Sequence, residues 1–303
     1  MGRPVLTAGD RARGLLLGLA AGHALGLGAE HVGTPTARRR RFPDGLRDVL
    51  RVDSDTSPWG DDVALAALVA EELCESEADL HRLADRWIGW WRRDGRGLDA
   101  RTAEALEHIA LHDAPVQTAL PDDDAPLARC LPLAVPACRQ PRNLVSGTYH
   151  IVLLTHPDPR SAWAAVAINV AAAGFLRGRR DIIPDVIEVL QANDAPPDLL
   201  GRVRRVPFLE RSDVERGRPG GGAVATAELV LWLAYHELSF ERALVWLVNR
   251  DGVTATVVAV AGGLLGARDG DQAIPARWIE ALPDPAYLRS LAKRLAAPRE
   301  APL

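Results

Sequence analysis

The chain has 303 residues, a formal net charge of −4, 48% hydrophobic residues and 25% charged residues. This balance is typical of a globular protein, and it excludes the strongly basic surface that nonspecific nucleic-acid binding needs. We expect no nucleic-acid partner and one domain over residues 1–303, a length that can bury a substantial core.

The first predicted helix spans Thr7 to Gly26 and carries glycines at a strict spacing of four residues. That spacing places the glycines along one helix face, where another helix or a ligand can approach the backbone closely. Arginines ahead of an apolar run also resemble a secretory signal, but we interpret the segment as a buried helix. No apolar run reaches the length of a membrane span, so no membrane partner is expected. The glycines are Gly14, Gly18, Gly22 and Gly26.

The next segment, Thr34 to Arg41, ends in four arginines before Phe42 and Pro43. We interpret this segment as a solvated basic loop, because runs of arginine usually face water. A phosphate contact is the alternative, since guanidinium groups bind phosphate well.

The segment Trp59 to Ala66 opens a helix with two adjacent acids, Asp61 and Asp62. Carboxylates in a first helical turn cap free N–H groups and favour the positive end of the helix dipole. They also present several oxygens to a hard cation such as Mg²⁺ or Mn²⁺. From these residues alone, both interpretations stay open.

Helical periodicity dominates the remaining chain, and strand-like alternation is scarce, so the fold class is predicted to be all-α. Tryptophans three and four residues apart near position 90 are expected to pack in the core. The predicted helices cover Asp62–Cys74, Ala78–Arg92, a broken helix at Leu127–Cys138, Arg160–Arg177, Asp181–Glu188, Thr226–His236, Phe240–Leu247, Val257–Ala267 and a last turn and helix at Ala273–Ile279 before a charged tail.

Three loops carry polar residues of interest. The acids 122–124 are either solvated or placed over a cleft, and His156 either positions a water molecule or caps the helix that follows. Gly220, Gly221 and Gly222 interrupt the chain before a helix. No strand precedes these glycines and no Gly-Lys-Ser follows them, so a P-loop is excluded.

In this order, the segments resemble the ADP-ribosylglycohydrolase family. The resemblance rests on the glycines from Gly14 to Gly26, the paired acids 61–62, the Thr155–Asp158 helix entry and the small-residue close from Thr254 to Gly262. It implies an orthogonal helical bundle whose central cleft binds ADP-ribose and two divalent cations, Mg or Mn. Members cleave the bond between ribose C1 and a modified side chain.

The resemblance also implies the roles of individual residues. Asp61 and Asp62 match the family's first metal-binding element and Thr256 matches the end of its second, so these three are the candidate metal ligands. Glu30 matches a loop glutamate that contacts a metal or acts on the leaving group, and we predict Glu30, Asp61 and Asp62 as the catalytic residues. The candidate ligand-binding residues are His23, His156, Gly220, Gly221 and Gly222.

The chain departs from the family at several ligand positions. Val253-Thr254-Ala255-Thr256 stands where members have Asp-x-Asp-Thr, Gly60 replaces a threonine, and His23 replaces an aspartate. Each change removes an oxygen ligand or a partner of one, so we expect at most one Mg or Mn ion, or none. His23 is then a packing residue, a ligand for a softer metal or an acid/base group.

Three hypotheses follow. The preferred one is a divergent member that binds ADP-ribose or a related nucleotide sugar and whose hydrolase activity is weak or lost. The alternatives are an active glycohydrolase using a single Mg or Mn ion, and a structural or partner-binding protein. We expect an ADP-ribose-like small molecule or an ADP-ribosylated protein as partner, and a monomer or small homo-oligomer.

The cysteines bear on location. Cys74, Cys130 and Cys138 are an odd number without C-x-x-C spacing, which argues against a disulfide framework and against a thiolate zinc site. A cytoplasmic location is therefore expected.

Overall fold

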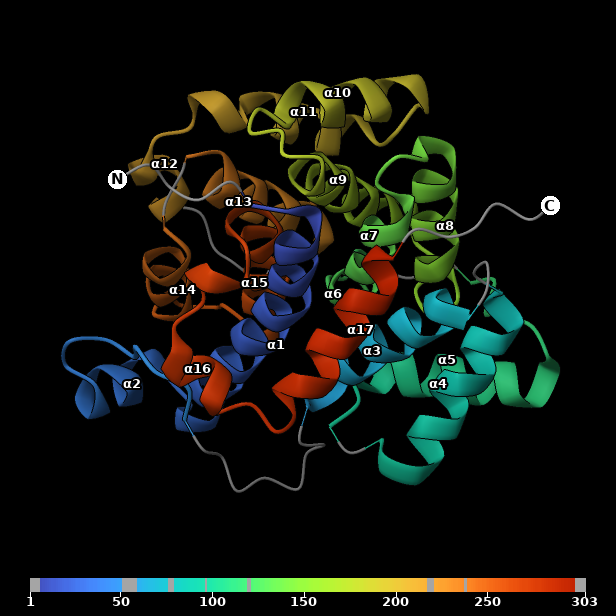
Figure 1. Cartoon of the computed structure of the whole chain (residues 1–303), viewed down its shortest axis with the longest axis horizontal. Helices are drawn as coiled ribbons and strands as arrows, with labels where there is room; N and C mark the ends of the chain where they lie inside the picture. The colour runs from blue at the N-terminus through green and yellow to red at the C-terminus, as the bar shows by residue number, and fades with distance from the viewer. Residues whose placement is uncertain are drawn as a thin grey trace.

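The structure, a computed structural model, describes residues 6–50, 59–75, 79–95, 97–118, 121–216, 221–236 and 239–297. Over these ranges the chain folds into helices and contains no strand, which confirms the all-α prediction (Figure 1).

The α-helices follow one another along the chain and are joined in three places by a short 3-10 turn. Their bounds are α1 Ala8–Val32, α2 Pro35–Arg41, α3 Gly60–Glu75, α4 Leu80–Asp94, α5 Ala100–His112, α6 Leu127–Cys130, α7 Ala134–Ala137, α8 Pro141–Leu153, α9 Pro159–Leu176, α10 Ile183–Ala192, α11 Pro197–Arg205, α12 Arg211–Arg216, α13 Ala223–Tyr235, α14 Phe240–Val248, α15 Ala255–Asp269, α16 Ala276–Glu280 and α17 Pro285–Ala296.

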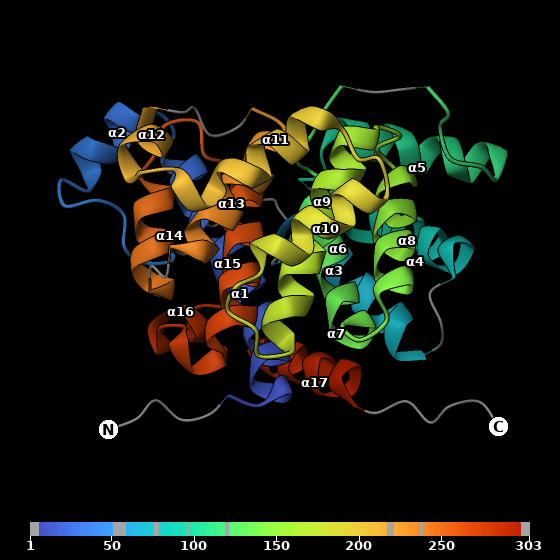
Figure 2. The same ribbon diagram turned by 90° about the horizontal axis from the view of Figure 1, so that it is seen from above.

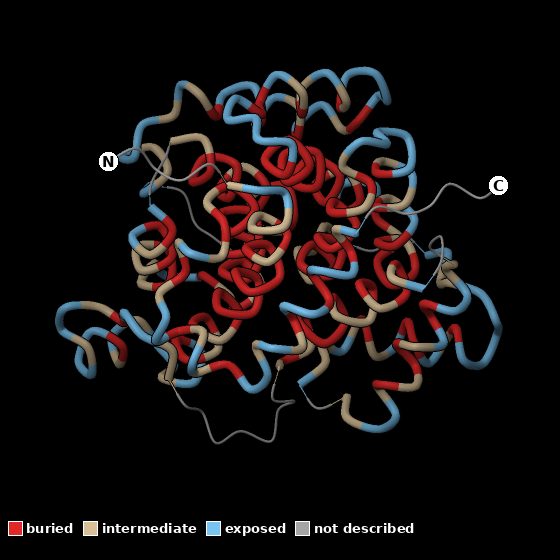
Figure 3. Tube along the Cα trace, viewed as in Figure 1, coloured by how far each residue is buried: buried red, intermediate tan, exposed pale blue. Residues whose placement is uncertain are grey.

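The centre of the molecule is the antiparallel pair α1 and α15, which lie side by side in Figures 1 and 2. A Cβ atom on Gly14 would lie 2.2 Å from the carbonyl oxygen of Gly266, and one on Gly18 would lie 2.3 Å from that of Gly262. The two backbones therefore touch along the glycine face of α1, as its spacing predicts, and the partner is a helix. Figure 3 shows both helices among the buried segments, with exposed segments around the outside.

Helix α1 is longer than predicted because it continues past Gly26 to Val32. By length and composition it could cross a membrane, which corrects the expectation that no apolar segment is long enough. However, 72% of its apolar window is buried inside the protein. Burial on all sides explains an apolar helix without a membrane.

The prediction of a loop over the arginine-rich segment is wrong, because these residues form α2. The Thr34 side chain accepts a hydrogen bond from the backbone N–H of Ala37 at 3.2 Å, and Pro35 occupies the first helical turn. A threonine cap followed by proline is a helix start, which the run of arginines obscured. Arg38 is buried and donates to the backbone oxygen of Arg250 at 3.3 Å, so one of the four arginines serves packing.

The sequence pattern did not predict helices α5, α8, α11, α12 and α17. Helix α17 lies where a charged tail was expected; the Asp284 side chain caps it by accepting from the N–H of Tyr287 at 3.0 Å. Leu288, Leu291 and Leu295 are buried on one face of this helix. Its charged residues therefore form the outer face of an amphipathic helix.

Candidate metal centre and ligand site

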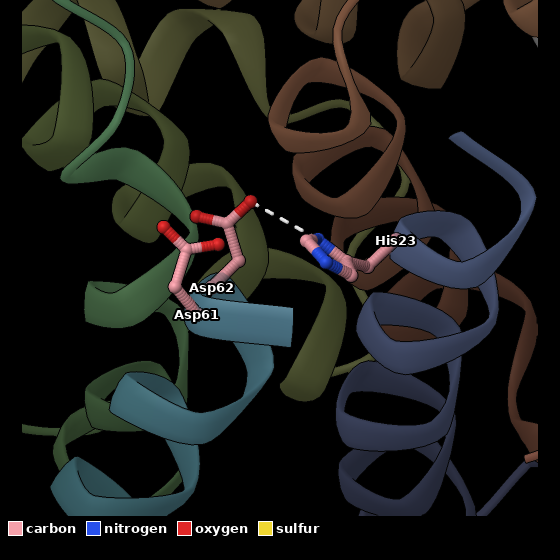
Figure 4. Close-up of side chains that lie close together, drawn as sticks. All are labelled: His23, Asp61 and Asp62. Atoms are coloured by element: carbon pink, nitrogen blue, oxygen red, sulfur yellow. Dashed lines mark hydrogen bonds and ion pairs between the residues drawn. The ribbon is translucent and has the colours of Figure 1, made fainter. Parts of the chain in front are cut away.

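Three side chains from two helices meet at the candidate site: His23 from α1, and Asp61 and Asp62 from the first turn of α3 (Figure 4). One ligand atom from each lies within 4.8 Å of the others. The imidazole Nδ1 of His23 is 3.1 Å from a carboxylate oxygen of Asp62, and both residues are only 2% exposed. One imidazole and two carboxylates form a donor set that fits a single divalent cation.

The absence of a side chain at Gly60 leaves space for the imidazole of His23. A Cβ atom at this position would lie 1.9 Å from Nε2 of His23, so no other residue fits without moving the ring. Its φ of +65° is also a conformation that favours glycine. His23 and Gly60 therefore form one arrangement, in which the imidazole occupies the space that a side chain at position 60 would need.

The ionisable groups of His23, Asp61 and Asp62 affect one another. Burial, and next the charge of Asp62, raise the pKa of Asp61 to about 6. Burial opposes protonation of His23, but the hydrogen bond to Asp62 and the nearby acids outweigh it and raise the pKa of His23. A buried carboxylate that resists losing its proton beside a second acid favours an added positive charge between the two side chains.

The acidic loop is placed at the site and is not simply solvated. Asp124 accepts a hydrogen bond from the Thr226 hydroxyl at 2.8 Å, and burial, with contributions from Asp123 and Asp62, raises its pKa to about 6. Asp122 accepts from the backbone N–H of Ala223 at 2.7 Å. The run of three acids was the sequence signal, but the effect of Asp62 on the pKa of Asp124 could only be seen in the fold.

Arg129 was missed in the sequence, although it is a charged residue in an otherwise apolar segment. It is 1% exposed and donates to the hydroxyls of Thr155 at 3.1 Å and Thr102 at 3.2 Å. Its positive charge acts on Asp61, where it opposes the rise in pKa. A buried guanidinium therefore balances part of the negative charge of the site.

His156 lies beside Thr155, to which Arg129 donates, and is not part of the cluster of His23, Asp61 and Asp62, called here the His23 cluster. His156 is fully buried, and its Nδ1 is 3.0 Å from the Thr155 hydroxyl. Its Nε2 has no hydrogen-bond partner within the described part of the chain. Burial, and next the charge of Arg129, lower the pKa of His156 from 6.5 to about 4. The imidazole is therefore neutral near pH 7.

Replacing His156 with glutamine is expected to reduce the loss of stability in acid. Between pH 6.5 and 4 the unfolded chain binds a proton at His156 and the folded chain does not, so stability falls as the pH falls through this range. A shift from 6.5 to about 4 corresponds to at most about 3 kcal/mol. Urea denaturation of wild type and variant at pH 7, 5 and 4 measures the difference.

The exposed His150 on α8 provides a matched control, because His150→Gln should leave the pH dependence unchanged. The comparison between variants also separates His156 from Asp61 and Asp124, whose raised pKa values act in the opposite direction. Equal pH profiles for wild type and His156→Gln would contradict the buried neutral imidazole.

Glu30 lies in the last turn of α1 and not in a loop. One of its carboxylate oxygens accepts from the backbone N–H of Ala255 at 2.7 Å, so Glu30 caps the start of α15. Val253 and Ala255 are buried there at 7% and 5% exposure. Thr256 follows in the first turn of α15, and in the described part of the chain its side chain makes no hydrogen bond to the His23 cluster.

The glycine loop before α13 is described only from Gly221 onward, and Gly220 lies outside the described residues. Gly222 has a φ of +87°, and a Cβ there would lie 2.7 Å from the carboxylate of Asp122. Gly221 lines a pocket of about 480 Å³ together with Arg202, Arg205 and Arg250. Two of the predicted glycines therefore lie next to acidic and basic groups near one end of α13.

Comparisons with known proteins agree with this architecture. A sequence model of the ADP-ribosylglycohydrolase family matches residues 4–302. The ADP-ribosylarginine hydrolase Tri1 of Pseudomonas putida (strain GB-1) is 23% identical over 299 residues, covering 94% of this chain and 78% of that protein. The ADP-ribosyl-[dinitrogen reductase] glycohydrolase of Rhodospirillum rubrum is 24% identical over 278 residues, covering 90% of each. A solved ADP-ribosylglycohydrolase-related protein complex superposes with a TM-score of 0.76 at 28% identity, covering 95% of this chain and 98% of that one.

Proposed function

Because the chain belongs to the ADP-ribosylglycohydrolase family, we propose that it recognises ADP-ribose or an ADP-ribosylated protein at the site around His23, Asp61 and Asp62. Relatives named as hydrolases of ADP-ribosylarginine and of ADP-ribosylated dinitrogen reductase support this class of ligand. A divalent cation bound there would orient ribose hydroxyls and an attacking water molecule.

We propose that hydrolysis is weak or lost in this chain. The observation that carries this proposal is the start of α15, where Val253 and Ala255 supply no carboxylate and Glu30 caps the helix. Two doubly charged cations at close range repel strongly and need several carboxylates to offset the repulsion. The His23 cluster offers two carboxylates, which suit one cation.

The surroundings of α13 support a phosphate-containing ligand. The first turn of this helix borders the acidic loop through Thr226, which donates to Asp124. The same turn borders the arginine-lined pocket through Ala225. The pocket volume of about 480 Å³ is within the range of small-molecule sites. Arginine side chains suit phosphate oxygens because the guanidinium presents several donors in one plane. A phosphate here would compete with Glu228, which lines the same pocket and accepts hydrogen bonds from Arg202 and Arg205.

Calorimetry with free ADP-ribose tests recognition, and hydrolysis of an ADP-ribosylarginine peptide with Mg²⁺ or Mn²⁺ tests activity. We expect saturable binding that Asp62→Ala weakens by at least about tenfold, because loss of a metal-site group usually costs that much. The exposed Asp251, two residues before Val253, gives a matched control in Asp251→Ala, which should bind like wild type.

The two measurements have separate outcomes. The absence of saturable heat with ADP-ribose would refute recognition and favour a structural or partner-binding role. Metal-dependent turnover that disappears in Asp61→Ala would refute the loss of activity and favour a hydrolase with one cation.

A further inference from the structure

We propose that His23 is a direct ligand of the one cation at this site and makes the site selective for a borderline transition ion such as Zn²⁺ or Co²⁺ over Mg²⁺. The inference rests on the proposed function insofar as Asp61 and Asp62 hold that cation. It concerns a residue at which the chain differs from its family, and it needs no bound nucleotide.

The spacing of the donor atoms fits a shared ion. Two adjacent ligands of a tetrahedral zinc ion, each about 2.0–2.2 Å from the metal, lie roughly 3.3 Å apart. Nδ1 of His23 and the carboxylate oxygen of Asp62 are 3.1 Å apart, and the three candidate ligand atoms are within 4.8 Å of one another. A cation can therefore replace the hydrogen bond between ring and carboxylate with little movement.

The two ring nitrogens of His23 have different surroundings, since Nε2 faces Gly60 and Nδ1 faces Asp62. His23 is 2% exposed, yet its Nε2 has no hydrogen-bond partner in the part of the chain that is described. The ring pairs with Asp62 through Nδ1, and Figure 4 shows the ring extending from α1 toward that carboxylate.

The chemistry of the donors determines the choice of ion. Imidazole nitrogen binds zinc, cobalt and iron well, whereas Mg²⁺ prefers oxygen ligands and retains several of its waters. One imidazole and two carboxylates leave a coordination position open for a ligand oxygen. The aspartate that the family resemblance places at position 23 would provide a harder oxygen donor.

Gly60 is required for this ligand set. Any side chain at position 60 would overlap the imidazole, since its Cβ would lie 1.9 Å from Nε2. His23→Asp and Gly60→Thr should therefore act together. Gly60→Thr alone displaces the ring. The double variant removes this overlap and provides oxygen donors at both places, while its threonine has to adopt the φ of +65° at position 60.

The experiment is a calorimetric titration of the metal-free full chain with Zn²⁺, Co²⁺ and Mg²⁺ in the absence of nucleotide, supported by the visible spectrum of the Co²⁺ complex. We expect the site at His23 to bind Zn²⁺ at least about tenfold more tightly than Mg²⁺. His23→Gln keeps a polar side chain of similar size and should lower Zn²⁺ affinity at least about tenfold and change the Co²⁺ spectrum. The double variant His23→Asp/Gly60→Thr should bind Mg²⁺ more tightly and Zn²⁺ more weakly than wild type.

A second pair of histidines provides the control. The rings of His108 and His112 on α5 lie 4.4 Å apart, and a pair of this kind can itself bind zinc. His108→Ala/His112→Ala should leave the Co²⁺ spectrum of the site unchanged. Zn²⁺ binding that is lost in this control, or that persists unweakened in His23→Gln, would overturn the proposal. Should the double variant fail to fold by circular dichroism, His23→Gln alone decides.

The outcome is separable from that of the proposed function. Failure of the protein to bind free ADP-ribose refutes the proposed recognition and leaves the metal titration intact. Equal affinity for Mg²⁺ and Zn²⁺ refutes the selectivity, whatever the nucleotide result.

Discussion

Replacing Gly266 with alanine is expected to destabilise the protein by at least about 3 kcal/mol, because the added methyl group has no space. The new Cβ would lie 1.9 Å from the backbone oxygen of Gly14, and neither backbone can move without separating α1 from α15. Ordinary alanine substitution in a helix is stabilising, so a loss of this size is due to the contact itself. Urea denaturation monitored by circular dichroism measures the change.

Gly89 in the middle of α4 is the matched control, because nothing lies within 4 Å of a Cβ built there. Gly89→Ala should raise the free energy of unfolding by about 0.5–1 kcal/mol through helix propensity alone. A Gly266→Ala protein as stable as wild type would contradict the close approach of the two central helices.

Introducing two acids by Val253→Asp together with Ala255→Asp is expected to raise the number of Mn²⁺ ions bound from at most one to two. The residues lie at the start of α15, where the positive end of the helix dipole favours carboxylates. The added charge would offset the repulsion between two cations that the present residues leave unbalanced. Calorimetry with Mn²⁺ measures the stoichiometry, and hydrolysis of an ADP-ribosylarginine peptide should increase with it.

The same double substitution with asparagine separates charge from shape. Val253→Asn with Ala255→Asn introduces side chains of nearly the same size without negative charge, and its Mn²⁺ stoichiometry should remain that of wild type. If the aspartate and asparagine variants bind the same amount of Mn²⁺, residues 253–256 are not the counterpart of the family's second metal motif.

Local signals predicted the central packing and the start of α3 well. The four-residue glycine spacing of α1 predicted a close neighbour, and α15 fills that position. Local signals failed to predict a helix where a run of charged residues concealed its cap or its buried face. Four arginines concealed the threonine cap of α2, and charged residues concealed the buried leucines Leu288, Leu291 and Leu295 of α17.

The resemblance gave Asp61 and Asp62 as the centre of the site, and the structure brings them together with His23. It did not predict that Asp124 and Arg129 act on the same charges, because no motif connects their segments to α3. A pKa depends on burial and on distances in space, and neither can be read from positions along the chain.

By itself, the sequence determined the all-α fold class and the acidic start of α3, because helix periodicity and capping depend on residues three or four positions apart. The order of its motifs gave the resemblance to the family. The tertiary structure alone decided that His23, 39 residues from Asp62, sits in the space left by Gly60. It also decided that Glu30 caps Ala255, 225 residues away. Ligation and steric exclusion act over a few ångströms, so only the packing of distant helices brings these residues together.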